Sequence, residues 1–384
     1  MNIADVKTYI VENANPARGG RHWLFVKLIT NDGIEGIGEP VRIGFDSPVA
    51  VQMIRSMAER HIIGMDPFNI EPMWRKMYSG TYRPGAAHMG ILSGFEMACW
   101  DIIGKAVGQP AYNLLGGRYH EKVRSYTYMY PAPDDAKHGM FEVQENADLA
   151  AQRAADYLKM GFTAIKIDPV VPLMTPAPEQ LSLESLENAE RVIRRVREAV
   201  GSKMDICIGT HGQMTTSSAI RLAKRLEKFD PLWFEEPVPP ENRDELARIA
   251  QHTTIPIATG ERLYTKYEFR ELLDRKAAQI LQFTLGSVGG LLEGKKVAGM
   301  AEAYYAQIAP HYYAGPVVFM ANVQLDVCSP NFLMQESVER FGGFYDELVT
   351  PPIRWEQGYV IPPTGPGLGI ELKMDVVEKH LYMR

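Results

Sequence analysis

Three short apolar runs in the middle of the chain each end in polar residues, and they do so at a regular distance. The runs are Met204–Ile208, Leu232–Phe234 and Ile255–Ala258. Gly209, Glu235 and Glu261, which lie at or just beyond their carboxyl ends, follow one another at intervals of 26 residues. The stretches between them carry apolar residues at helical spacing. Alternation of buried strand, polar strand end and helix is typical of a parallel α/β barrel, whose active site lies at the carboxyl ends of the strands.

The same alternation extends over residues 121–344 and predicts an eight-stranded (β/α)8 barrel as the catalytic domain. The expected strands are Arg124–Tyr128, Ala164–Asp168, Asp205–Gly209, Leu232–Phe234, Ile255–Thr259, Gln279–Gln282, Gln307–Ala309 and Asn331–Gln335. A long proline-rich connection, Pro169–Gln180, directly follows the second strand. We expect this connection to cover the mouth of the barrel.

Residues 1–120 follow a different pattern, which predicts an α+β capping domain. Trp23–Thr30 and Ile34–Gly38 read as two strands joined by a turn at Asn31–Gly33. Helical patterns follow at Val49–Ile62 and Met89–Val107. The barrel pattern ends before residue 345, and we expect residues 345–384 to return to the cap.

Composition narrows the classes of partner. The chain has 384 residues, 46% of them hydrophobic and 23% charged, with a net charge of −6, which is typical of a globular protein that binds no nucleic acid. The three cysteines are far apart in apolar contexts and predict neither a disulfide framework nor a zinc site. The first residues lack the apolar core of a signal peptide, so we expect a cytoplasmic protein that binds a small molecule and no membrane.

The predicted strand ends supply a set of ionisable side chains. In strand order they are Lys166 and Asp168, His211, Glu235 and Glu236, Glu261 and Arg262, His311, and Glu336. Carboxylates on adjacent strands, here Glu235 and Glu261, suit Mg²⁺. Two histidines on well-separated strands suit an acid and a base on opposite faces of a substrate.

Some of these residues also have plain structural readings. Lys166 and Asp168 alternate along a strand and face the same way, so they either contact substrate or form a simple ion pair. Arg262 either binds substrate or pairs with Glu236. If the cap closes over the barrel, Trp23 and Arg83 line the site, although Trp23 suits a core position equally well.

Several motifs, taken together, resemble those of one known family. They are Trp100–Lys105 with Leu114–Gly117, Phe234–Pro237, Thr259–Arg262, Ala309–His311 and the closing Gly365–Gly369. In this order and spacing the chain resembles the enolase superfamily, in its mandelate racemase-like branch, and is most similar to the D-galactonate dehydratase-like sugar-acid dehydratases. Such enzymes commonly form homo-oligomers.

The resemblance implies a reaction and a role for each matching residue. The family abstracts the proton α to a carboxylate, and a divalent metal stabilises the enediolate that forms. His311 matches the base, His211 the acid that protonates the departing β-hydroxyl, and Glu336 a residue that helps to hold the substrate carboxylate. Glu235 and Glu261 match the second and third metal ligands.

Two positions depart from the family pattern. Gly209 stands where the family has its first metal ligand, an aspartate, and Thr284 stands where an aspartate supports the base. We therefore expect Mg²⁺ to bind weakly or not at all. The sequence predicts a sugar-acid dehydratase-like lyase that acts by α-proton abstraction. The alternatives are a metal-independent isomerase, cycloisomerase or lyase, in which Lys166 or Arg262 replaces the cation, and a catalytically silent sugar-acid-binding paralogue.

Overall fold

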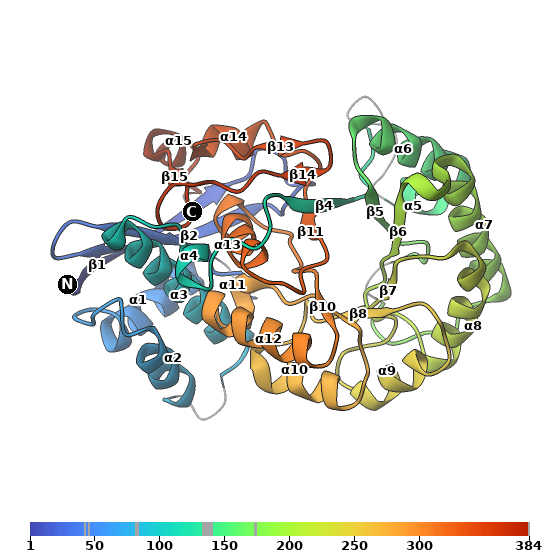
Figure 1. Cartoon of the computed structure of the whole chain (residues 1–384), viewed down its shortest axis with the longest axis horizontal. Coiled ribbons are helices and arrows are strands. Elements are labelled where there is room, and N and C mark those ends of the chain that lie inside the picture. The colour runs from blue at the N-terminus through green and yellow to red at the C-terminus, as the bar shows by residue number, and fades with distance from the viewer. Residues whose placement is uncertain (42–43, 45–46, 81–83, 133–140, 173–174, 383–384) are drawn as a thin grey trace.

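The N-terminal part of the chain forms an antiparallel sheet covered by helices, shown at the left of Figure 1. The computed structural model describes residues 1–384 except 42–43, 45–46, 81–83, 133–140, 173–174 and 383–384. The elements are β1 (Ile3–Glu12), β2 (His22–Thr30), β3 (Glu35–Gly38), α1 (Ser47–His61), α2 (Ile70–Ser79), α3 (Ala86–Val107) and α4 (Ala111–Leu114). The predicted hairpin is confirmed, with Gly33 at φ +83° in its turn. The strand β1 and the helix α2 were not predicted.

Parallel strands form the barrel. They are β4 (Val123–Tyr128), β5 (Ala164–Ile167), β6 (Asp205–Ile208), β7 (Trp233–Glu235), β8 (Ile257–Thr259), β9 (Ile280–Leu281), β10 (Gln307–Ile308) and β11 (Gln335–Ser337). Neighbours pair in this order from β4 to β10. Ile308 of β10 bridges to Phe332, and β11 pairs in parallel with β4, so the eight strands close on themselves. The eighth strand begins at Gln335. The sequence had predicted that it begins at Asn331.

Helices form the outer ring of the barrel in Figure 1. They are α5 (Glu142–Glu145), α6 (Ala147–Met160), α7 (Leu183–Val200), α8 (Thr216–Leu226), α9 (Arg243–Ala250), α10 (Thr265–Asp274), α11 (Leu285–Val288), α12 (Leu291–Ala303) and α13 (Pro316–Val327), with short 3₁₀ turns at Gly201–Lys203 and Glu227–Phe229. In α7, Leu186, Ile193 and Val196 lie on one buried face. The Ser182 hydroxyl accepts the N–H of Ser185 and begins that helix.

One layer of side chains fills the centre of the barrel, and each strand or its flank contributes one residue. The layer consists of Tyr126, Ala164, Cys207, Trp233, Ala258, Ile280, Ala309 and Met334, all buried. Because side chains alternate along a strand, the residue two positions later points inward again, one level nearer the carboxyl end. This register decides which side chains can face a substrate.

The C-terminal segment touches both parts of the molecule. Its elements are α14 (Phe344–Leu348), β12 (Val349–Thr350), β13 (Trp355–Glu356), β14 (Tyr359–Val360), β15 (Glu371–Leu372) and α15 (Met374–Lys379). Leu381 bridges to Val11 of β1, while β14 pairs antiparallel with β4 of the barrel. The domain limits 1–120, 121–344 and 345–384 stay predictions.

Two buried glutamates attach the N-terminal unit to helices of the barrel. Glu39 accepts the backbone N–H groups of Gly315, Val317 and Val318 at the start of α13, at 2.6 to 3.1 Å. Glu96 of α3 accepts those of Leu291 and Leu292 at the start of α12. These N–H groups have no partner within their own helices, so the carboxylates satisfy them and hold the cap in place.

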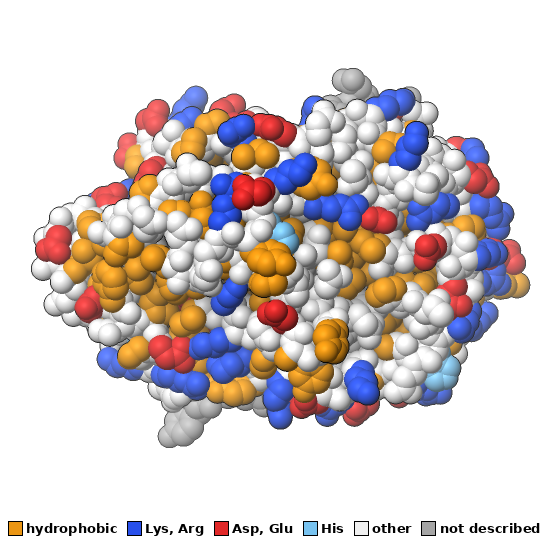
Figure 2. Space-filling model, in the orientation of Figure 1, with side chains coloured by type: hydrophobic (Ala, Val, Ile, Leu, Met, Phe, Trp, Pro, Cys, Tyr) orange, Lys and Arg blue, Asp and Glu red, His pale blue; other side chains and the backbone are white. Residues whose placement is uncertain are grey.

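The surface mixes charges of both signs. In Figure 2, Lys and Arg side chains lie among Asp and Glu side chains, while hydrophobic side chains gather over the N-terminal unit. Among the helices that the structure describes, none combines the length and apolar character needed to cross a membrane.

Candidate active site

A ring of inward-facing positions lies two residues beyond the apolar layer on each strand. It comprises Tyr128, Lys166, Gly209, Glu235, Gly260, Gln282, His311 and Glu336, so six positions carry polar side chains and two are glycines. Four of the predicted site residues, Lys166, Glu235, His311 and Glu336, thus lie at inward-facing positions at the carboxyl ends of the strands. Glu261 and His211 come from the loops that immediately follow β8 and β6.

Lys166 forms ion pairs with two glutamates of this ring. Its Nζ atom lies 2.7 Å from Oε1 of Glu336 and 3.0 Å from Oε1 of Glu235, and all three side chains are almost fully buried. Burial alone would lower the pKa of Lys166, but the charges of Glu235 and Glu336 outweigh it and raise that pKa well above the ordinary value. Lys166 is therefore an ammonium ion, and it pairs with these glutamates and not with Asp168.

Glu235 is engaged at both carboxylate oxygens. Lys166 contacts Oε1, while Oε2 accepts the indole N–H of Trp233 at 3.0 Å and the amide of Gln282 at 2.8 Å. Gln282 was not singled out in the sequence. The sequence could have indicated it, because Gln282 lies two residues after the inward-facing Ile280 and side chains two apart on a strand point to the same side.

His211 pairs with Asp168. Its Nδ1 atom lies 3.3 Å from Oδ2 of Asp168, and the same oxygen accepts the phenol of Tyr128 at 2.9 Å. Burial lowers the pKa of His211, but attraction to Asp168 and Glu261 outweighs burial, so that pKa is raised. Because 22% of its side chain is exposed, a substrate can reach His211.

His311 lies among different partners. Its Nδ1 atom is 2.9 Å from the hydroxyl of Thr284, and its Nε2 atom is 3.1 Å from Oε2 of Glu261 and 3.9 Å from Oε2 of Glu336. Glu336 is further fixed by the backbone N–H of Tyr312, at 2.9 Å. One nitrogen of the imidazole thus contacts a neutral hydroxyl, and the other is directed at the carboxyl groups of Glu261 and Glu336.

The remaining predicted site residues take part in structural contacts or are not described. Arg262 donates to Glu236 at 2.7 Å, which matches the structural reading of that pair. Trp23 is 2% exposed and stacks on Phe344, a core position away from solvent. Arg83 falls outside the described residues. The substrate-binding roles of these residues stay predictions.

Part of the cap reaches the barrel mouth through a residue that the sequence did not single out. Arg18, in the loop between β1 and β2, pairs with Glu339 just after β11 at 2.7 Å and lies over the ring of Tyr130. Glu339 also accepts from Arg153 and Tyr157. No local sequence pattern links Arg18 to Glu339, because they are 321 residues apart.

The proline-rich connection after β5 is attached to the loop that carries His211. Its residue Glu179 forms a parallel bridge with Met214, and the Gln213 side chain donates to the carbonyl of Val170. The Gln213 amide oxygen in turn accepts the backbone N–H of His211. The connection therefore helps to position His211.

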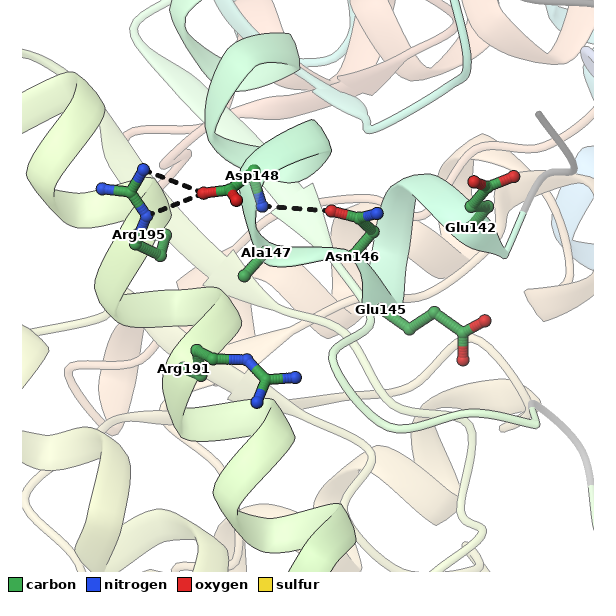
Figure 3. A pocket seen from close by; sticks show the side chains of 7 residues that line it. All are labelled: Glu142, Glu145, Asn146, Ala147, Asp148, Arg191 and Arg195. Atoms are coloured by element: carbon green, nitrogen blue, oxygen red, sulfur yellow. Dashed lines mark hydrogen bonds and ion pairs between the residues drawn. The ribbon is translucent and has the colours of Figure 1, made fainter. Parts of the chain in front are cut away.

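A separate hollow of about 640 Å³ lies on the outside of the barrel, where α5 and α6 meet α7 (Figure 3). Its polar residues serve local structure: Asn146 caps α6 through the N–H of Asp148, and Arg195 pairs with Asp148. The hollow contains none of the strand-end residues named above.

Comparison with known proteins agrees with this arrangement. The family described as "Enolase C-terminal domain-like" matches residues 149–376. The N-terminal domain of the mandelate racemase / muconate lactonizing enzyme family matches residues 4–116. The chain belongs to the enolase superfamily. Within it, the chain falls in the mandelate racemase-like branch, and its fold is the α/β barrel with an α+β cap that this superfamily shares.

Relatives within the superfamily include sugar-acid dehydratases. The chain is 32% identical to D-xylonate dehydratase of Haloferax volcanii, over 99% of this chain and 89% of that protein. It is 33% identical to D-galactonate dehydratase of Verminephrobacter eiseniae, over 98% and 94%. A crystal structure from Burkholderia SAR-1, provisionally named a mandelate racemase/muconate lactonizing enzyme, is 55% identical and superposes with a TM-score of 0.96, over 100% of this chain and 94% of that chain.

Enolase-superfamily members typically bind Mg²⁺, and the residues of this site fit such an ion poorly. Gly209 contributes no side chain, and Glu235 has both oxygens engaged, one of them by a cation. Within the described part of the chain, no three acidic, histidine or cysteine side chains are grouped as metal ligands. The donor set of a three-carboxylate centre is therefore incomplete, and we derive no reaction step through a metal.

Proposed function

We propose that the protein is a carbon–oxygen lyase that dehydrates a polyhydroxylated carboxylic acid, beginning with removal of the proton α to the carboxylate. One observation carries the proposal. Two histidines come from strand ends that are four strands apart, His211 after β6 and His311 after β10, and Glu261, from the strand end midway between them, lies 3.1 Å from Nε2 of His311. A substrate at that point would have one imidazole on either side. A protein that merely binds sugar acids has no need of this pair.

The two histidines suit opposite proton transfers. In the tautomer in which the Thr284 hydroxyl accepts the Nδ1 proton of His311, Nε2 is the nitrogen that takes the α-proton. The negative charge of Asp168 favours the protonated form of His211, which can give its proton to the departing β-hydroxyl, so that this group leaves as water. The electron pair of the C–H bond first moves into the carboxylate to give an enediolate, and it then forms the double bond between the α and β carbons as the C–O bond breaks. The resulting enol tautomerises to a 2-oxo-3-deoxy acid.

Within this proposal, divalent metal ions bind weakly and D-galactonate is turned over slowly or not at all. The family has an aspartate where this chain has Thr284, so this chain lacks an anion that would stabilise the imidazolium of His311 after proton abstraction. A substrate with a more acidic α-proton, such as a keto or lactone derivative of a sugar acid, tolerates that loss better than a plain aldonate. An isomerase or cycloisomerase of such a derivative is the second candidate, because it uses the same first step.

A dehydration screen tests the proposal. Sugar acids, their lactones and keto derivatives are incubated with the protein, and 2-oxo acid is captured as its semicarbazone. We expect at least one compound to give a 2-oxo product that disappears in the His311→Asn variant. Compounds that bind with no loss of substrate and no new product would identify a silent sugar-acid-binding protein and refute the lyase.

A further inference from the structure

Lys166 near the carboxyl end of β5 and Asp168 just after that strand bring a cation and an anion to the barrel mouth. We propose that the Lys166 ammonium is the resident cation of this site, the group that holds the substrate carboxylate and stabilises the enediolate, and that Asp168 supplies the carboxylate missing at Gly209. The assignment of cation and anion rests on geometry alone. Its catalytic meaning rests on the function proposed above.

The position of Asp168 relative to Gly209 is the first observation. A Cβ atom on Gly209 would collide with Oδ1 of Asp168 and lie 3.1 Å from its Cγ atom, closer than real Cβ atoms approach such neighbours comfortably. The carboxylate that an aspartate at position 209 would offer is thus excluded by a carboxylate from the next strand. Glycine at position 209 leaves room for the Asp168 carboxylate, whereas a side chain at that position would collide with it.

Asp168 is also held so that it faces the site. Its side chain is fully buried, and Oδ2 is fixed by Tyr128 and His211. Oδ1 is buried without a hydrogen-bond partner within the described structure. Burying a carboxylate oxygen without a hydrogen-bond donor costs free energy of folding unless a ligand or a water molecule donates a hydrogen bond to it.

The position of Lys166 is the second observation. Its ammonium lies between Glu235 and Glu336 with a side chain only 4% exposed, while the ring of Tyr128 covers it 6.0 Å away. A buried ammonium held by two carboxylates is strongly paired and leaves little room for a second cation beside it. A metal that used Glu235 would have to displace Lys166 from Oε1 of that residue.

The arrangement gives Lys166 a direct role toward substrate. An ammonium has three donors, and two of them serve Glu235 and Glu336. The third can bind one oxygen of a substrate carboxylate, and negative charge on that oxygen grows as the α-proton leaves for His311. Lys166 forms and breaks no covalent bond in this step and stabilises charge by position alone.

Metal binding without any assay of activity tests the inference. Mn²⁺ is titrated into the purified chain and followed by calorimetry and electron paramagnetic resonance. We expect the unmodified protein to bind in the millimolar range or more weakly. Lys166→Met, which keeps the length of the side chain and removes its charge, leaves two buried glutamates without their cation and should tighten Mn²⁺ binding roughly 10- to 100-fold. Lys159→Met, at an exposed ion pair with Asp156, is the matched control and should bind as weakly as the unmodified protein.

A second variant keeps the test decisive if Lys166→Met does not fold. In Lys166→Gln the side-chain amide can still donate to Glu235 or Glu336 but carries no charge, and Mn²⁺ should again bind more tightly. Micromolar Mn²⁺ binding by the unmodified protein would overturn the inference even if the chain proves to be an α-proton enzyme. Weak binding that neither variant improves would overturn it as well, since the two substitutions would then have no bearing on a cation.

Discussion

The hydroxyl of Thr284 lies 2.9 Å from Nδ1 of His311 and orients the imidazole without giving it a negative charge. An aspartate here would both orient the ring and favour its protonated form. A threonine keeps the first effect and loses the second. The base is therefore positioned as the superfamily resemblance implies, but its protonated product is less stabilised.

Removing this hydroxyl should slow proton abstraction. In Thr284→Val the shape is kept but Nδ1 loses its partner, so the ring can turn or take the wrong tautomer. We expect kcat to fall roughly 10- to 100-fold, since small errors in the position of a catalytic group have that effect. Thr284→Ser, which retains the hydroxyl, is the control and should stay close to the unmodified enzyme. Equal rates for valine and serine variants would show that the contact has no catalytic importance.

The pH dependence of the reaction should report the His211–Asp168 pair. Burial lowers the pKa of His211, and the charges of Asp168 and Glu261 raise it above the ordinary value. Asp168→Asn removes one of these charges, so the pKa falls and His211 loses its proton at a lower pH. The basic limb of the kcat/KM profile should move to lower pH. Asp205→Asn, at the far end of β6 where Asp205 pairs with Arg124, should leave that limb in place. An unmoved limb in Asp168→Asn would remove His211 from the role of acid.

Glu39 should make stability depend on pH. Its complete burial raises its pKa to about 7, although three backbone N–H groups act in the opposite direction. The folded state thus holds this proton more strongly than the unfolded state. The resulting stabilisation is complete below the ordinary carboxyl pKa and is lost as pH rises toward about 7. The loss amounts to about 3 kcal/mol.

Urea denaturation at pH 5 and pH 8 measures this effect against the Glu39→Gln variant, which cannot ionise. The advantage of the unmodified protein over Glu39→Gln should shrink as pH rises. Glu39→Ala should be destabilised at both pH values, because the N–H groups at the start of α13 lose their acceptor. A difference between glutamate and glutamine that does not change with pH would contradict the raised pKa.

The sequence predicted the first barrel strands well and misplaced the last one, β11. The strands β5 to β8 contain apolar residues before a polar end, so they were predicted within one or two residues. The strand β11 consists of Gln335, Glu336 and Ser337, all buried, and carries no hydrophobic signal. The predicted strand was therefore placed on the apolar residues that precede it.

The site could be predicted only as far as strand ends define it. Alternation along strands indicated that Lys166, Glu235 and Glu336 face the barrel mouth, but spacing cannot say which charges pair. Lys166 proved to bridge two glutamates from distant strands, and Asp168 proved to serve His211. Such choices depend on side-chain positions across the barrel, which are set by packing and not by sequence distance.

Exchange of the α-proton with solvent tests the central claim most directly. Candidate sugar acids and their lactones are incubated with the protein in D₂O, and the α-proton is followed by NMR with no requirement for complete dehydration. We predict exchange in the unmodified protein that vanishes in His311→Asn and persists, at a reduced rate, in Lys166→Met, because His311 is the base and Lys166 stabilises charge. Exchange that survives in His311→Asn and stops in Lys166→Met would contradict this account, since the base would then lie on β5.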